Sequence, residues 1–82
     1  MDEFLGAVNL FPFDFEIQGW MACDGRMLPI NQYAALFSLL GTRYGGNGTT
    51  DFALPKMDAV PASDGDPLTY QICILGIYPP RQ

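Results

Sequence analysis

The 82-residue sequence contains no histidine and few charged residues. Without histidine it lacks the commonest general base and the commonest zinc ligand of proteins. Charged residues make up 16% of the chain, whereas an ordinary globular domain has about 25%. The chain therefore has too little charge to cover the surface of an isolated domain, and we expect another chain to cover part of it.

Basic residues are especially scarce, and the formal net charge is −5. The four that are present are scattered along the chain as Arg26, Arg43, Lys56 and Arg81. A nucleic-acid-binding surface needs clustered lysines and arginines that displace counterions. We therefore expect no nucleic-acid partner.

Long apolar runs are also missing. No stretch approaches the roughly 18 apolar residues of a membrane-spanning helix, so we expect no membrane insertion. The start of the chain, MDEFLGAV, is acidic where a signal peptide would be basic. No signal peptide is visible.

The remaining reactive residues do not form a catalytic or metal-binding set. Two cysteines, Cys23 and Cys73, cannot make a structural zinc site without other ligands. They can form one disulfide or stay as free thiols, and without an export signal we favour free thiols. The nine carboxylates lie mostly in turn contexts, and SDGDP (63–67) falls short of a calcium-binding loop. We expect no enzyme activity, no metal and no cofactor.

Several stretches predict β-structure. The aromatic segment 4–15 is typical of a strand that ends near Pro12, because proline cannot donate to a ladder. Segment 19–29 predicts a short hairpin around Asp24-Gly25. The near-continuous apolar run in 68–81 predicts a strand that is buried on both faces.

One helix is predicted, from Asn31 to Leu40. Asn31 is a suitable N-cap, and Gly41 stands where a helix end needs a left-handed residue. The apolar residues fall at i, i+3, i+4 and i+7 and form one face. They are Tyr33, Leu36, Phe37 and Leu40.

The stretch LGTRYGGNGTTDFALP (40–55) is rich in glycine but lacks the pattern of a phosphate-binding loop. Its glycines follow the helix and no lysine accompanies them. We predict that Gly45, Gly46 and Gly48 permit tight turns with positive φ. Asn47-Gly48-Thr49 fits the N-glycosylation pattern, but that pattern is short and common by chance, and without an export signal we favour a plain turn. The side chains expected at the surface as partner or ligand contacts are Arg43, Tyr44, Asn47, Thr49 and Thr50.

The middle of the chain resembles the phage tail collar domain, which also occurs in bacterial microcystin-dependent proteins. The resemblance rests on GWMACDGRMLPINQYAALFSLLGTRYGGNGTTDFALP. The family pattern runs roughly G-W-x-x-C-D-G-x-x-L-P-I, then A-L-F-S-L-L-G-T-x-Y-G-G-x-G-x-T-x-F-x-L-P. The tail LTYQICILGIYPPR is similar to the ending of short bacterial members. Where the family usually continues F-A-L-P-D-L-R-G-R, this chain has FALPKMDAV and lacks the acid and both arginines.

The resemblance implies a structural or adhesive module of phage tails and related fibres, without known catalysis. Together with the composition it predicts one α+β domain over residues 1–82, with a small, mostly antiparallel sheet, one packed helix and a long Gly-rich loop. The expected core residues are Trp20, Leu36, Phe37, Leu40, Phe52, Leu54, Ile72 and Ile74.

Two functions are compatible with this sequence. The first is a self-assembling structural protein of a virion tail or an extracellular or cell-surface filament. Its self-contacts would be apolar and aromatic, with strand addition to a neighbour's sheet as one route. The assembly contacts expected are Phe4, Phe11, Phe13 and Phe15. The second is a receptor- or glycan-binding tip that uses the loop from Arg43 to Asp51.

Overall fold

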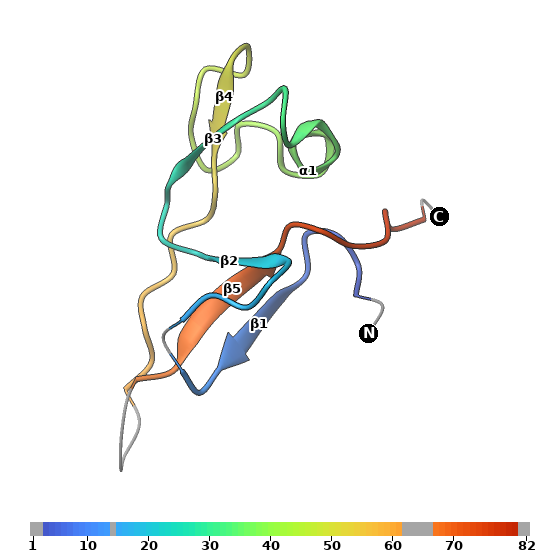
Figure 1. Cartoon of the computed structure of the whole chain (residues 1–82). Helices are drawn as coiled ribbons and strands as arrows, with labels where there is room; N and C mark the ends of the chain where they lie inside the picture. Colours follow the sequence, from blue (N-terminus) through green and yellow to red (C-terminus); the bar gives the residue numbers. More distant parts are fainter. Residues whose placement is uncertain (1–2, 14, 62–66, 81–82) are drawn as a thin grey trace.

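A computed structural model describes residues 3–13, 15–61 and 67–80. It contains a three-stranded and a two-stranded antiparallel sheet and one short helix, so the predicted α+β class is confirmed (Figure 1). In chain order the elements are β1 (Val8–Phe11), β2 (Trp20–Ala22), β3 (Met27–Pro29), α1 (Ala34–Leu40), β4 (Asp51–Ala53) and β5 (Thr69–Cys73).

The larger sheet has the strand order β1-β5-β2, with β5 in the centre. Both neighbours run antiparallel to β5, with Val8 and Met21 each opposite Ile72. Gln71, Ile72 and Cys73 are almost completely buried. The prediction that this strand is covered on both faces is therefore confirmed, although the strand ends at Cys73 and the apolar residues beyond it leave the sheet.

The chain between β1 and β2 crosses the face of β5 that points away from the main core. There Gln71, a buried polar residue, accepts a hydrogen bond from the backbone N–H of Ile17 (3.2 Å) and donates one to the carbonyl of Phe15 (2.8 Å). The Thr69 hydroxyl donates to the carbonyl of Phe13 (2.5 Å). These bonds fix the crossing segment, because buried polar groups need partners.

The predicted hairpin at Asp24-Gly25 is wrong. β2 pairs with β5 and β3 pairs with β4, while Asp24 forms an isolated bridge with Lys56 and Gly25 has a φ of 81°. The segment around Asp24-Gly25 thus carries the chain from one sheet to the other. A local turn signal does not determine which strands pair, because pairing depends on burial and long-range contacts.

The helix is shorter than predicted. It begins at Ala34, not after Asn31, and Tyr33 occupies the N-cap without a side-chain hydrogen bond. The preceding residues form a turn instead, in which the N–H of Tyr33 donates to the carbonyls of Pro29 and Ile30. Gly41 has a positive φ of 60°, but its ψ of −146° lies outside the predicted left-handed helical region.

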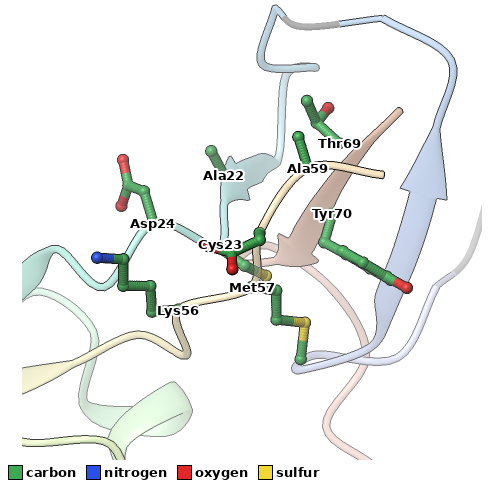
Figure 2. Close-up of a pocket in the computed structure, with 9 residues that line it drawn as sticks. Ala22, Cys23, Asp24, Lys56, Met57, Ala59, Thr69 and Tyr70 are labelled. Atoms are coloured by element: carbon green, nitrogen blue, oxygen red, sulfur yellow. The ribbon is translucent and has the colours of Figure 1, made fainter. Parts of the chain in front are cut away.

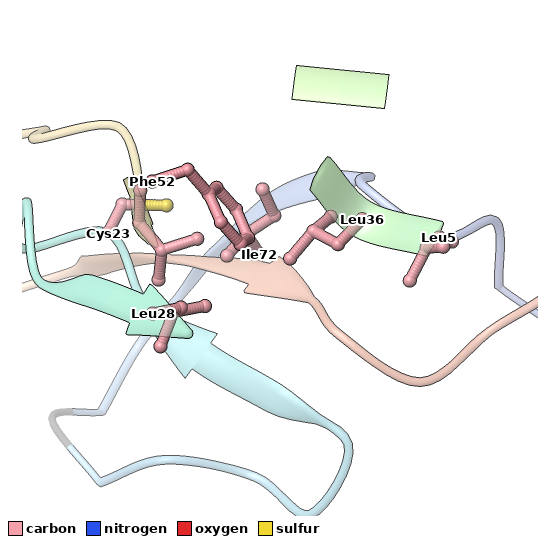
Figure 3. Packing of buried hydrophobic residues seen from close by; sticks show 7 residues of the cluster. Leu5, Cys23, Leu28, Leu36, Phe52 and Ile72 are labelled. Carbon is pink, nitrogen blue, oxygen red and sulfur yellow. The ribbon is translucent and has the colours of Figure 1, made fainter. Parts of the chain in front are cut away.

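The core lies between β5, β3, β4 and the helix (Figure 3). Four predicted core residues, Leu36, Phe52, Leu54 and Ile72, are at most 1% exposed. The other four are only partly buried: Trp20, Phe37, Leu40 and Ile74. Buried hydrophobic residues outside the expected core list are Leu5, Cys23, Leu28, Ala53 and Cys73.

The two cysteines are free and buried. Cys23 lies opposite Tyr70, whose carbonyl accepts its N–H at 3.0 Å. Cys73 is three residues further along β5, a separation of roughly 10 Å at the usual rise of a strand. A disulfide requires Cα atoms within about 7 Å. The sheet register therefore keeps the two thiols apart, as the free-thiol prediction requires.

The first and last segments of the described chain lie side by side (Figure 1). Phe4 and Ile77 form an isolated parallel bridge, with the N–H of Leu5 donating to the carbonyl of Ile77 at 2.8 Å. Gly76 permits this contact, since a Cβ there would collide with the carbonyl oxygen of Glu3. The turn predicted for SDGDP falls mainly on residues 62–66, outside the described residues.

Candidate functional site

The Gly-rich loop folds back onto β4. Gly45, Gly46 and Gly48 have φ values of 134°, 97° and 74°. At Gly46 a Cβ would collide with the Cα of Phe52 and would lie 2.8 Å from the carbonyl oxygen of Asp51. Gly46 therefore serves a close approach between two backbone segments in addition to its positive φ.

The Asn47 side chain organises this loop from within. Its Oδ1 accepts hydrogen bonds from the N–H groups of Thr49 (2.7 Å), Thr50 (2.8 Å) and Asp51 (3.3 Å). Its Nδ2 donates to the Thr50 hydroxyl at 2.9 Å. The Asp51 carboxylate accepts the N–H of Asn47 in return (3.0 Å). The polar groups of Asn47 and Thr50 thus bind other parts of the loop.

The remaining polar side chains of the loop face solvent. Arg43, Tyr44 and Thr49 are exposed, and within the described parts of the chain the Arg43 side chain forms no ion pair. A shallow hollow of about 320 Å³ lies beside the loop. It is lined by Pro29, Ile30, Asn31, Thr49 and Thr50.

The aromatic residues at the end of β1 form a continuous stack. The ring centroids of Phe13 and Phe15 are 4.4 Å apart, those of Phe11 and Phe13 5.4 Å apart, and Phe11 meets Trp20 edge-on at 5.3 Å. Phe15, at the outer end, is 63% exposed. Of the four predicted assembly contacts, three therefore lie together, and Phe4 lies elsewhere, beside Ile77.

A second apolar surface is formed by the terminal segments. Phe4 and Ile77 are each 50% exposed, Leu75 is 72% exposed and Tyr78 45%. The Tyr78 hydroxyl lies 2.7 Å from that of Ser38 on the helix. From the sequence, Leu75, Ile77 and Tyr78 were predicted to lie in a buried strand. Gly76 and the Pro79-Pro80 pair were the signals that the strand ends before them.

One charged cluster was not recognised from the sequence. Arg26 binds the carboxylates of Glu16 (2.7 Å) and Asp24 (2.9 Å). The Glu16 carboxylate also accepts the N–H of Ala22 at 2.8 Å, on the outer side of β2. Hydrogen bonding to Arg26 lowers the pKa of Asp24 below its usual value. The cluster thus covers the edge of β2 with charge.

A cavity of about 270 Å³ lies beside Cys23 (Figure 2). Its walls carry Lys56, Met57 and Tyr70. Burial, and to a smaller extent Asp24, raises the pKa of the Cys23 thiol to about 11. The nucleophilic form of cysteine is the thiolate, so at neutral pH this thiol is an inert core group.

The described residues hold no cluster of three or more cysteines and carboxylates with the geometry of a metal site. Among the same residues no helix has the length and hydropathy needed to cross a bilayer.

Comparison with known proteins identifies the family. Residues 6–60 match the Phage Tail Collar Domain. A segment of 43 residues is 44% identical to Protein RhiB of Rhizobium leguminosarum bv. viciae, covering 49% of this chain and 20% of RhiB. The chain thus aligns with about a fifth of that relative's length. No solved structure matches the chain.

Proposed function

This chain belongs to the phage tail collar domain family, and from that premise we propose that it is a non-catalytic structural protein of a phage-tail-like fibre or extracellular filament. In this role copies of the chain associate with one another through their apolar surfaces. The virion tail or a cell-surface filament is the corresponding location.

The observation that supports this proposal is the amount of apolar surface that remains exposed. Among the residues that the structure describes, nine large hydrophobic side chains are exposed, in a chain with only 16% charged residues. They are Phe4, Leu10, Phe15, Met27, Tyr44, Met57, Leu75, Ile77 and Tyr78. Contiguous apolar patches on soluble proteins usually mark interaction sites.

The apolar residues are also distributed in a way that suits open assembly. The aromatic stack lies at the Phe11 end of β1, whereas the terminal patch adjoins the segment before Val8, where Phe4 pairs with Ile77. Two different surfaces on one molecule that contact each other head to tail give a ring or an open polymer.

Electron microscopy and light scattering of the purified full chain test the proposal. We expect particles larger than a monomer, and fibres if the contacts do not close. A monomer at micromolar concentration and near-neutral pH would contradict it. Deleting the N-terminal segment through Phe11 is not a suitable test, because that would remove β1 and the buried Leu5.

A second function, binding of a receptor or glycan through the loop from Arg43 to Asp51, is favoured by one specific observation. Arg43, Tyr44 and Thr49 are exposed, and the hydrogen bonds of Asn47 hold the loop that carries them. Preorganised polar groups bind ligands at a lower entropic cost. A glycan array with the wild-type protein and the Arg43→Ala variant tests this function: retained sugars that the variant loses would support it.

A further inference from the structure

The two edges of the larger sheet differ in whether their outward-facing backbone N–H groups are already hydrogen-bonded or are free to pair with another strand. In β2, Gly19, Met21 and Cys23 face β5, as the bonds from Ile74 to Gly19 and from Cys23 to Tyr70 show. Trp20 and Ala22 therefore point their backbone groups outward. Their N–H groups are occupied by the carbonyl of Ile17 (2.9 Å) and the carboxylate of Glu16 (2.8 Å).

The β1 edge has no such cover. The N–H of Cys73 donates to the carbonyl of Ala7 at 2.8 Å, and in the antiparallel alternation Asn9 and Phe11 also face β5. Val8 and Leu10 must then direct their N–H and C=O groups outward. No hydrogen bond from the described residues reaches these groups. Sheet edges in proteins are usually blocked by charge, proline or a covering segment.

The sequence along this edge also lacks charge. From Phe4 to Phe13 there is no Asp, Glu, Lys or Arg, although the whole chain carries a net charge of −5. An approaching acidic partner is therefore not repelled by the strand itself. Such an edge is suited to pair with another uncharged strand.

We propose that the open edge of β1 pairs with β1 of a second copy of this chain, antiparallel and about a two-fold axis at Asn9. This inference deepens the proposed self-association by naming its contact. In this register Val8 of each copy lies opposite Leu10 of the other.

The side chains of β1 are self-complementary in this arrangement. The two outward-facing residues form hydrogen-bonded pairs, and each pair exchanges two N–H···O=C bonds. Val8, which packs against the core, and Leu10, which is 41% exposed, lie on the same face of the sheet because they are two residues apart. The Val8 side chain of each copy therefore meets the Leu10 side chain of the other copy across the new ladder. Asn9, on the opposite face, meets Asn9 of the second copy, and two amides can bond to each other.

A charged or polar partner strand would gain less from this edge, because Val8 and Leu10 offer it no polar or charged side chain to pair with. Cross-strand apolar pairs stabilise a sheet, whereas unmatched pairs do not. The sheet in the pair would run β2-β5-β1-β1-β5-β2, with only the charged β2 edges left outside. Closure about a two-fold axis gives a dimer, and growth into a filament then needs the terminal apolar patch as a second contact.

The register can be tested by cross-linking of the full chain. Residues in a non-hydrogen-bonded antiparallel pair have Cα atoms about 4.5 Å apart, within the range for a disulfide. We expect Asn9→Cys to form a covalent dimer under mild oxidation, at least about tenfold faster than Met27→Cys, a matched control on the exposed β3 edge that is 49% exposed. The native thiols do not interfere, because Cys23 and Cys73 are 2% and 1% exposed. Equal rates for the two variants would overturn the inference.

A second measurement avoids cysteine. Leu10→Lys places a charge on the open edge without removing a bond to β5, and sedimentation should show the dimer dissociation constant raised at least about tenfold relative to Met27→Lys. An unchanged dissociation constant would overturn the inference.

If wild-type fibres form while both edge variants behave like their controls, the edge contact is wrong and the proposed function stands. If Asn9→Cys cross-links but no fibres form, the edge contact is right and the filament is wrong.

Discussion

The Gly-rich loop and the terminal segments differ in whether their side chains contact the rest of the protein or face solvent. In the loop the side chain of Asn47 and the backbone of Gly45 and Gly48 bind other atoms of the loop and of β4. In the terminal segments the backbone is paired, through Phe4 and Ile77, but the large side chains point outward. The polar, Gly-rich loop therefore uses its groups to maintain the fold, whereas the terminal segments leave large apolar side chains exposed.

The largest effect that tests this comparison is expected at Gly46. Gly46→Ala combines a strained positive φ with a collision against the backbone of β4, and we expect a loss of about 2–4 kcal/mol in unfolding free energy. Urea denaturation measures it. Gly41→Ala is the matched control, because its φ is also positive but its Cβ would meet nothing within 4 Å. If both variants lose the same stability, the close approach contributes nothing.

A smaller effect is expected at Asn47. Removing its side chain leaves three loop N–H groups without their acceptor, and we expect Asn47→Ala to cost about 1–2 kcal/mol, as the loss of a helix cap does. The exposed Thr49→Ala should stay within about 0.5 kcal/mol. Thermal unfolding of both variants checks this. A larger loss for Thr49→Ala would show that the loop is held by other contacts.

Local features of this fold were predictable from the sequence. The helix follows from the apolar periodicity, and the end of β1 near Pro12 follows from the N–H that proline lacks. The buried strand β5 follows from a near-continuous apolar run. The role of Gly46 was predicted only as a positive φ. Its close approach to Phe52 depends on how the loop folds back onto β4, and no pattern along the chain contains that information.

Strand pairing and edge protection were not predictable. Asp24-Gly25 indicated a hairpin, yet the neighbouring strands join different sheets. The ion pairs of Arg26 with Glu16 and Asp24 connect residues whose proximity depends on the crossing segment. The exposure of Leu75, Ile77 and Tyr78 followed from the chain leaving the sheet after Cys73, which Gly76 indicated only in retrospect.

The buried thiols allow the core to be tested through the pH dependence of the unfolding free energy. The pKa of Cys23 is raised from 9.0 to about 11 in the folded protein. Above pH 9 the unfolded chain loses this proton while the folded chain retains it, so the stability should fall between about pH 9 and 11 and then level off. Cys23→Ala should weaken this decline, and Cys73, whose pKa is also raised by burial, should account for part of what remains. Urea denaturation at a series of pH values measures the slope, and a slope unchanged by Cys23→Ala would contradict the assignment.

The smallest change in stability is expected at the terminal apolar patch, where the change in assembly should be clear. Leu75 is 72% exposed, so Leu75→Gln removes little buried apolar area and should alter the unfolding free energy by no more than about 0.5 kcal/mol. If the patch contacts a second copy, the same substitution should shift the particle size distribution toward smaller species in light scattering. Thr49→Gln, on the exposed loop, is the control for an added amide at the surface. Self-association that is lost with Thr49→Gln but kept with Leu75→Gln would reverse the comparison and place the assembly contact on the loop.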